Sequence, residues 1–334
     1  MEKFNNLLAK MNLVKLRLSM VGTLAFLIGL STLFFAVILS LIGPLNIILL
    51  VSFVVIFNLI QWLIAPYMID AMYKVKEISR NENPKLYNMV ENLSKKAKIK
   101  MPKVMIAKIP IPNAFAYGSP IAGRRVAVTE TLLKTLDDEE VEAVIGHELG
   151  HLKHRDVQIM MFASVLPAIF YFIAYSFMMS AWFGGYGRDR SNAGLAILIG
   201  LACMVIYWIL SLFVLGLSRL REYYADSHSA KIVEDGPRKL SEALAKIVDY
   251  SANMKYSSHQ QASAFNSFRT LFITDPERAD KDYQEIVKSS GYPRDRELVE
   301  RILSRRITTT DRILELFSTH PNIVKRLKAL QRLS

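Results

Sequence analysis

His147-Glu148-Leu149-Gly150-His151 is the stretch from which the rest of the chain is interpreted. On an α-helix, residues i and i+4 share one face, so His147 and His151 can bind the same ion. Neutral imidazoles are good ligands for Zn²⁺, and two of them leave room for a third protein ligand and a water. Glu148 places a carboxylate beside that water, where a general base is needed. The stretch predicts a zinc site with a catalytic Glu148; the alternative is two surface histidines on a charged helix.

The composition combines strongly apolar and strongly charged regions. Of 334 residues, 51% are hydrophobic and 22% are charged, which is unusual for one soluble core and indicates long apolar runs beside polar segments. The net charge of +12 suits nucleic acid or anionic lipid, and the apolar runs favour lipid, so no nucleic-acid partner is expected. The single cysteine, Cys203, excludes a disulfide or a cysteine-based metal site within one chain. We expect no cleavable signal peptide.

Two uncharged regions predict membrane hairpins. Residues 18–69 carry no charge, and Gly43-Pro44 divides them into two arms that can each cross about 30 Å of hydrocarbon as a helix. Residues 157–218 form a second apolar hairpin with a glycine-rich turn; the alternative is segments that do not fully span the bilayer. Lysine and arginine are concentrated on the side opposite both turns, which predicts that this side, with the zinc site, faces the cytosol.

Short elements are expected around the zinc helix. Three short strands are predicted to form a small sheet, and residues 70–100 are predicted to be mostly helical. Thr129 can cap one helix, and Asp137 with Glu140 makes a capping-box start for the helix that carries His147. The predicted strands cover 104–107, 113–118 and 126–129; helices are expected at 240–250, 295–316 and 322–333, with a loop-rich segment at 251–292.

His154 is a tempting third ligand because it lies on the same helix face as His147. Seven residues of continuous helix advance about 10.5 Å, whereas a Zn–N bond measures about 2.1 Å. The two side chains therefore cannot reach one ion unless the helix breaks, and Leu152-Lys153 offers no glycine for a sharp turn. His154 is expected to be exposed or to support a ligand.

Glu222 is the better third ligand. It follows the second apolar hairpin directly, and an even number of crossings returns it to the side that holds His151. Asp226, at i+4 from Glu222, can accept a hydrogen bond from the far nitrogen of a ligand imidazole. The alternative is that both carboxylates are ordinary surface charge beside Arg219 and Arg221.

These motifs together resemble the HtpX family of membrane zinc metallopeptidases, relatives of the CAAX prenyl proteases. The resemblance rests on Gly146–His151, the two apolar segments and Arg221–Asp226. Asn113-Ala114-Phe115-Ala116 is similar to the family's strand before the zinc helix, and Ser318–Pro321 with Arg326 is similar to its C-terminal motif. The resemblance implies His147, His151 and Glu222 as zinc ligands and Glu148 as the catalytic residue.

The fold class expected is mainly α, a membrane α+β protein with four spans in two hairpins and a gluzincin-like helical protease domain that carries a small β-sheet. The resemblance implies one Zn²⁺ per chain, polypeptide substrates that include misfolded or damaged membrane proteins, and a role in quality control at the cell membrane. The expected parts are an N-terminal hairpin (1–69), a first protease segment (70–156), a second hairpin (157–218) and a second protease segment (219–334).

In the expected reaction, Glu148 takes a proton from water and delivers it to the leaving amine. His320 or a tyrosine is a candidate donor to the oxyanion, although His320 before Pro321 can equally be a helix-start residue. The segment 113–116 is either an edge strand that pairs with substrate or an ordinary internal strand. The rival functions are a narrow-specificity membrane protease of the prenyl-protein type and a catalytically silent membrane scaffold.

Overall fold

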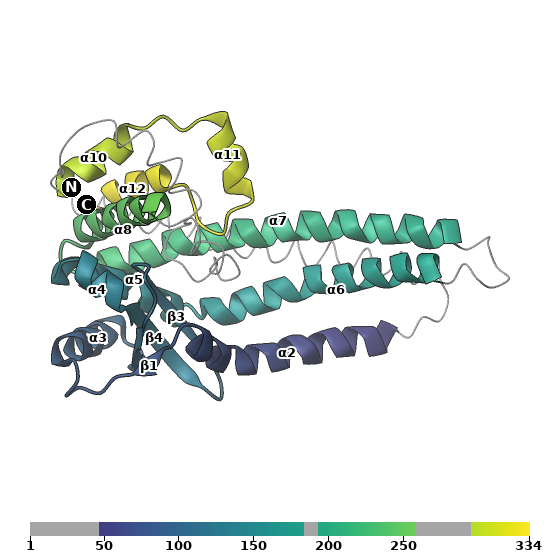
Figure 1. Ribbon diagram of the computed structural model, residues 1–334, viewed down its shortest axis with the longest axis horizontal. Helices are drawn as coiled ribbons and strands as arrows, with labels where there is room; N and C mark the ends of the chain where they lie inside the picture. The colour runs from purple at the N-terminus through teal and green to yellow at the C-terminus, as the bar shows by residue number, and fades with distance from the viewer. Residues whose placement is uncertain (1–46, 184–192, 258–294) are drawn as a thin grey trace. The chain divides into compact units, whose positions relative to one another are not determined.

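The computed structural model describes residues 47–183, 193–257 and 295–334 (Figure 1). The first arm of the predicted N-terminal hairpin with its Gly43-Pro44 turn, the glycine-rich turn of the second hairpin and most of the loop predicted at 251–292 lie outside the described residues. The described residues form two compact units. One contains those up to Trp62 and those of Gln158–Leu217; the other contains Leu63–Val157 and Ser218–Ser334.

A four-stranded mixed sheet lies in the second unit, with strand order β1-β2-β4-β3. β2 (Lys103–Ala107) runs parallel to β4 (Gly123–Thr129), while β1 (Lys76–Glu77) and β3 (Ala114–Ser119) pair antiparallel with β2 and β4. The prediction of about three strands missed β1, which lies in a region expected to be mostly helical. β1 has two exposed polar residues and therefore shows no alternating pattern. β3 is one of the two edge strands of this sheet, and β1 is the other.

Helices cover the sheet in the same unit, and several begin where the sequence predicts. The Thr129 side chain accepts from the Leu132 N–H at the start of α4, and the Glu140 side chain accepts from the Asp137 N–H at the start of α5. The helices of this unit are α3 (Pro84–Ala97), α4 (Glu130–Thr135), α5 (Asp138–Lys153), α8 (Gly236–Ser257), α10 (Asp295–Ser304), α11 (Thr309–Leu316) and α12 (Ile323–Gln331).

The single helix predicted at 295–316 is two helices. α10 ends at Ser304, and Thr308 starts α11 with a capping box in which its hydroxyl accepts from the Asp311 N–H. The Asp311 carboxylate accepts from the Thr308 N–H in return. A side-chain cap of this kind stabilises a helix start by about 1 kcal/mol. The cap therefore favours a new helix start at Thr308 over continuation of α10, although apolar residues at helical spacing continue between the two helices.

One apolar core joins the sheet to the helices of this unit. It contains Val90 and Leu93 of α3, Val126 of β4, Val144 of α5 and Leu244 of α8, all essentially without solvent exposure. Burying such a side chain contributes about 1.5–3 kcal/mol, so α5 is held rigidly between the sheet and α8. A rigid α5 matters because it carries three of the predicted site residues.

The other unit contains apolar portions of α2 (Ile47–Met72), α6 (Asp156–Phe183) and α7 (Ala193–Ile232). α6 and α7 pack through Phe170, Ile173, Cys203 and Leu210. Within the described ranges, one helix, Gly194–Ile232, is long and apolar enough to cross a membrane, and Leu166–Met178 is a shorter apolar stretch. The four predicted spans stay a prediction.

α7 exposes large apolar side chains along its uncharged portion, as a lipid-facing helix does. Leu198, Val205 and Trp208 are each more than half exposed. The helix then continues without a break past Ser218, where a change of domain was predicted, because the composition changes there without any glycine or proline to end the helix. Its charged end, 218–232, belongs to the unit that contains the sheet.

Candidate metal centre

α5 places His147, Glu148 and His151 inside the protein. His147 and Glu148 are nearly inaccessible to solvent, and His151 is partly buried. The predicted alternative, two surface histidines on a charged helix, is therefore wrong. Burial of three polar side chains on one helix requires partners for each of them, since an unpaired buried polar group costs several kcal/mol.

The third member of the group comes from the charged end of α7. Nε2 of His147 lies 3.6 Å from Oε2 of Glu222, Nε2 of His151 lies 3.5 Å from Oε1 of Glu222, and the two Nε2 atoms are 3.1 Å apart. Tetrahedral ligands with bonds of about 2.1 Å are about 3.4 Å apart, so the triangle has the size that one zinc ion needs. Two imidazoles and one carboxylate are also the donor types that zinc prefers.

Two glycines allow α7 to approach α5 closely enough to form this group. A Cβ on Gly146 would lie 2.9 Å from Val233 Cγ2, and a Cβ on Gly150 would lie 3.1 Å from Ala225 Cα. Gly146 and Gly150 are spaced i, i+4, as are the two histidines that follow each of them. The sequence around the zinc motif therefore carries the packing interface as well as the ligands.

Each histidine is oriented by a carboxylate on its far ring nitrogen. Nδ1 of His147 lies 2.8 Å from Oδ1 of Asp226, and Nδ1 of His151 lies 2.6 Å from Oδ2 of Asp156. A carboxylate at Nδ1 fixes the tautomer in which Nε2 carries a lone pair toward the ion. The structure thus places Asp226 where the sequence predicted it and adds Asp156, which was not predicted.

Arg326 of α12 completes the network. Its guanidinium donates to both oxygens of Asp226, at 2.6 and 2.9 Å, and its Nη1 lies 3.2 Å from Oε2 of Glu222. Burial opposes ionisation of Asp226, but the Arg326 charge and the His147 hydrogen bond hold the pKa of Asp226 below its ordinary value. Burial likewise opposes ionisation of Asp156, but the Arg221 guanidinium, 3.2 Å away, holds the pKa of Asp156 below its ordinary value.

The electrostatic environment of the three-residue group favours a cation. Burial disfavours charge on His147, yet its contacts with Asp226 and Glu222 raise the pKa of His147 to about 9. Burial also disfavours charge on Glu222, but His320, His147 and Arg326 hold the pKa of Glu222 well below its ordinary value. Glu222 is therefore a carboxylate at neutral pH, as a metal ligand must be.

Glu148 lies between the group and the edge strand β3. Burial raises the pKa of Glu148 above its ordinary value, against the opposing charges of His151 and His147, and the Ala116 N–H donates to its carboxylate. The Thr129 N–H donates to the Asn113 carbonyl at 2.9 Å. Because antiparallel pairs alternate, this pairing turns the main-chain groups of Ala114 and Ala116 away from β4, which is how the Ala116 N–H reaches Glu148.

The remaining predicted candidates lie nearby. Nε2 of His320 lies 3.9 Å from Oε1 of Glu222, and its Nδ1 contacts the Thr319 hydroxyl at 3.0 Å. His154 is not one of the three grouped residues; its ring lies against that of Tyr224, with centroids 3.9 Å apart. α5 ends at Lys153, and the chain turns at Arg155, a non-glycine residue with a φ of 56°.

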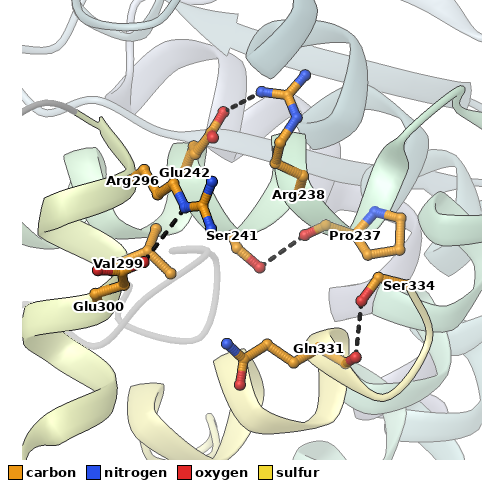
Figure 2. A pocket seen from close by; sticks show the side chains of 9 residues that line it. All are labelled: Pro237, Arg238, Ser241, Glu242, Arg296, Val299, Glu300, Gln331 and Ser334. Carbon is orange, nitrogen blue, oxygen red and sulfur yellow. Dashed lines mark hydrogen bonds and ion pairs between the residues drawn. The ribbon is translucent and has the colours of Figure 1, made fainter.

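Two other features of the same unit are less suited to a metal or substrate. Asp137, Glu140 and Asp295 converge, but the Lys246 ammonium lies 2.9–3.1 Å from all three and already neutralises them. A cavity of about 300 Å³ lies among α8, α10 and the C-terminal residues, and Figure 2 shows its charged side chains turned toward one another. Arg238 bonds Glu242 at 2.7 Å, and Arg296 bonds Glu300 at 3.3 Å.

Asp156 and Arg326 are the members of the network whose contacts sequence reasoning missed. Asp156 is five residues after His151, beyond the helix end, so helical spacing does not connect the two. Arg326 appears in the C-terminal motif, but nothing in its local sequence indicates a buried partner 100 residues away. The available signal was position: Asp156 is the last charged residue before the uncharged run that begins at Val157.

Comparison with known proteins agrees with this geometry. The family model described as "Peptidase family M48" matches residues 80–334. A Protease HtpX homolog of Thermoplasma volcanium is 36% identical over 84% of this chain and 81% of its own length, and one of Aeropyrum pernix is 38% identical over 83% of each. A Protease HtpX homolog 2 of Sulfurisphaera tokodaii is 35% identical over 96% of this chain and 97% of its own length.

A solved structure shares the fold. The crystal structure of S. mikatae Ste24p aligns with a TM-score of 0.53 at 16% identity, covering 95% of this chain and 67% of that chain. This likeness concerns the fold alone, whereas the family match and the sequence relatives cover most of the chain at more than 30% identity. With its two histidines and glutamate converging beside a buried Glu148, the chain belongs to peptidase family M48 and is a metallopeptidase.

Proposed function

We propose that this chain is a membrane-bound zinc endopeptidase that hydrolyses misfolded or damaged membrane proteins at the cytosolic face. The observation that carries the catalytic part is the convergence of His147, His151 and Glu222 beside a buried Glu148. The relatives named Protease HtpX homolog support the proteolytic activity. One zinc ion per chain is proposed, because one group of suitable donors has the required size.

His147, His151 and Glu222 are the proposed metal ligands. A bound zinc ion supplies a Lewis acid and lowers the pKa of a water that it holds. Asp226 and Asp156 keep the two imidazoles in the ligand tautomer, and Arg326 keeps Asp226 and Glu222 ionised and in place.

Glu148 is the proposed general base. Burial moves the pKa of Glu148 upward, in the direction of neutral pH. Such a shift suits a group that must first accept a proton from water and then release it to the leaving amine. The Ala116 N–H orients the carboxylate from the neighbouring strand. The edge of β3 that faces away from β4, including Ala114 and the carbonyl of Ala116, is the proposed docking strand for an extended substrate, with Asn113 and Phe115 anchoring it to the fold.

His320 is the proposed donor to the oxyanion that forms on the substrate carbonyl. It is buried, lies 3.9 Å from Glu222 and precedes α12, whereas the proposed ligands lie on α5 and α7. A positioned donor of this kind typically lowers the barrier by about 3–4 kcal/mol.

The proposed topology follows the sequence: two membrane hairpins at 1–69 and 157–218, and a cytosolic protease domain built from 70–156 and 219–334. The exposed apolar side chains of α7 support a span there. The concentration of lysine and arginine on the side that carries the zinc ligands supports the cytosolic orientation. Other parts of the proposed topology rest on the uncharged runs.

The test is cleavage of an unfolded polypeptide by the full chain, purified in detergent and loaded with Zn²⁺. Glu148→Gln keeps the size of the side chain but removes the base, so we expect kcat to fall by about 10²–10⁴ with zinc retained. Glu142→Gln, the same change about one turn from the start of the same helix and without a ligand role, is the matched control and should keep full activity.

Zinc stoichiometry is measured on each variant in the same preparations. Chelation should abolish wild-type cleavage, and added zinc should restore it. Cleavage that survives Glu148→Gln or is insensitive to chelator would falsify the mechanism. Purified chain that binds zinc but cleaves no unfolded polypeptide would favour the scaffold alternative.

A further inference from the structure

α11 buries charged side chains and exposes apolar ones, the opposite of an ordinary surface helix. Its buried residues are Asp311 and Glu315, whereas Ile313, Leu314, Leu316 and Phe317 are 53%, 38%, 51% and 58% exposed. The four apolar residues are related by spacings of three and four, so they share one face. A surface helix in water normally buries such a face and exposes its charges. α11 and Phe317 therefore present an apolar face outward, which an apolar surrounding would cover.

Polar contacts hold the inner side of α11. Asp311 accepts from Arg305 at 3.2 Å, while Glu315 accepts from the Asn322 N–H at 3.1 Å and forms an ion pair with Lys325. The helix thus gains its fixed orientation from charged groups that are paired underneath it. Its apolar side chains make no contribution to the core of the unit, so burial inside the fold does not explain them.

Arg219 connects α11 to the point where α7 leaves its apolar run. It is the first charged residue after the uncharged stretch that ends at Ser218. Its Nη1 donates to the carbonyls of Glu315 at 2.7 Å, Leu316 at 3.2 Å and Ser318 at 2.7 Å. The C-terminal end of α11 is therefore held within one side-chain length of Arg219, the residue at which α7 changes from apolar to charged.

We propose that α11, followed by Phe317, lies in the interface of the lipid bilayer, with its exposed apolar face among the headgroups and upper acyl chains. Two observations select lipid over other apolar partners: the Arg219 contact at the end of the α7 apolar run, and exposed arginines beside the patch. Arg306 and Arg312 are both exposed and complement anionic headgroups, each worth about 1 kcal/mol near such a surface. An interfacial helix of this kind inserts by about 5–10 Å.

This inference rests on the proposed span through α7 but not on catalysis. If α11 lies in the interface, the protease unit has a second attachment to the membrane besides α7. The Ser318–Pro321 segment, which follows α11 and contains His320, would then be held close to the bilayer surface. That placement suits substrates whose cleavable segments emerge from the membrane.

The test uses single-cysteine variants of the full chain in a Cys203→Ala background, each labelled with an environment-sensitive fluorophore. The chain is reconstituted into vesicles of phosphatidylcholine and phosphatidylglycerol that carry a nitroxide either near the headgroup or at the end of an acyl chain. Ile313→Cys and Phe317→Cys report on α11. Leu198→Cys reports on the apolar portion of α7, and Lys96→Cys, exposed on α3, reports on water.

We expect labels at 313 and 317 to lose most of their fluorescence to the shallow nitroxide and less to the deep one, while the label at 96 keeps its fluorescence with both. Quenching at 198 without quenching at 313 and 317 would overturn the placement of α11 and leave the α7 span intact. Absence of quenching at 198 as well would overturn the proposed span itself.

Labels at 313 and 317 could also show the emission of an apolar environment without being quenched by either nitroxide lipid. That result contradicts the proposal, because it shows that protein covers the apolar face. The covering surface would then be another segment of this chain, a second copy or a substrate.

Discussion

At the scale of single residues, the buried carboxylates differ in what they contact and therefore in what they do. Glu222 faces the Nε2 atoms of both histidines, whereas Asp156 and Asp226 face their Nδ1 atoms. A carboxylate at Nε2 can share an ion with the ring, and a carboxylate at Nδ1 can only orient the ring. The geometry therefore separates one proposed ligand from two positioning residues of the same charge.

Asp156→Asn is expected to lower zinc affinity by about 10–100-fold without unfolding the chain. The amide keeps the shape of the side chain but loses the charge that favours the correct His151 tautomer and that pairs with Arg221. Zinc affinity is measured by competition with a chromogenic chelator.

Asp138→Asn is the matched control on the neighbouring helix. Its carboxylate pairs with Lys85 on the surface, with more than half of each side chain exposed, and such pairs contribute little. Equal zinc affinities for Asp156→Asn and Asp138→Asn would show that Asp156 does not act on the metal.

At the scale of elements, the centre depends on two helices that meet without side chains between them. Gly146 and Gly150 of α5 face Ala225, His228 and Ser229 of α7 and Val233 just beyond its end. The Ser229 hydroxyl also donates to the Ala143 carbonyl at 2.7 Å, which fixes the register of the contact. The distance between the helix axes therefore sets the distance between Glu222 and the two histidines.

Gly150→Ala should weaken zinc binding and lower the thermal midpoint, although alanine is intrinsically the better helix former by about 1 kcal/mol. The added Cβ would lie 3.1 Å from Ala225 Cα, and a backbone atom cannot rotate away, so the helices must separate by a few tenths of an ångström. Thermal unfolding in detergent and zinc affinity are measured together.

Gly194→Ala provides the comparison, because an added Cβ there meets nothing within 4 Å. It should leave zinc affinity unchanged and stability equal or slightly higher. A Gly150→Ala variant that behaves like Gly194→Ala would mean that close helix contact is not required.

At the scale of the whole molecule, the unit that carries the centre is assembled from two chain segments separated by the apolar hairpin. His147 and His151 come from the first segment, while Glu222, His320 and Arg326 come from the second. A metal ion held by both segments links parts of the chain that are distant in sequence. Binding to the folded chain alone stabilises it by RT ln(1 + [L]/Kd), which is about 4 kcal/mol at a thousandfold excess over Kd.

Chelation is therefore expected to lower the Tm of the wild-type chain, and Glu222→Gln should remove most of the difference between the loaded and chelated Tm. The amide is a poorer metal ligand, and it also loses the contacts of the carboxylate with Arg326 and His320. Thermal unfolding with and without chelator gives both differences. A full zinc-dependent increment in Glu222→Gln would remove Glu222 from the proposed ligand set.

Several elements were predictable because their signals are local. The spacing of His147 and His151, the capping residues Thr129 and Glu140 and the uncharged run of α7 all act within a few residues or one helix. The two-residue strand β1 and the break before α11 were not predicted. The first is too short to show a period, and the second depends on a reciprocal cap that competes with continued helical spacing.

The sequence alone determined the chemistry available at the centre, because two imidazoles at positions i and i+4 of one helix can face one point whatever surrounds them. Only the tertiary structure decided which distant groups complete it. Asp156 reaches His151 through a turn at Arg155, and Arg326 reaches Asp226 from another helix. These contacts depend on how close helices pack and where a chain turns. Such properties arise from steric fit between segments and leave no period in the local sequence.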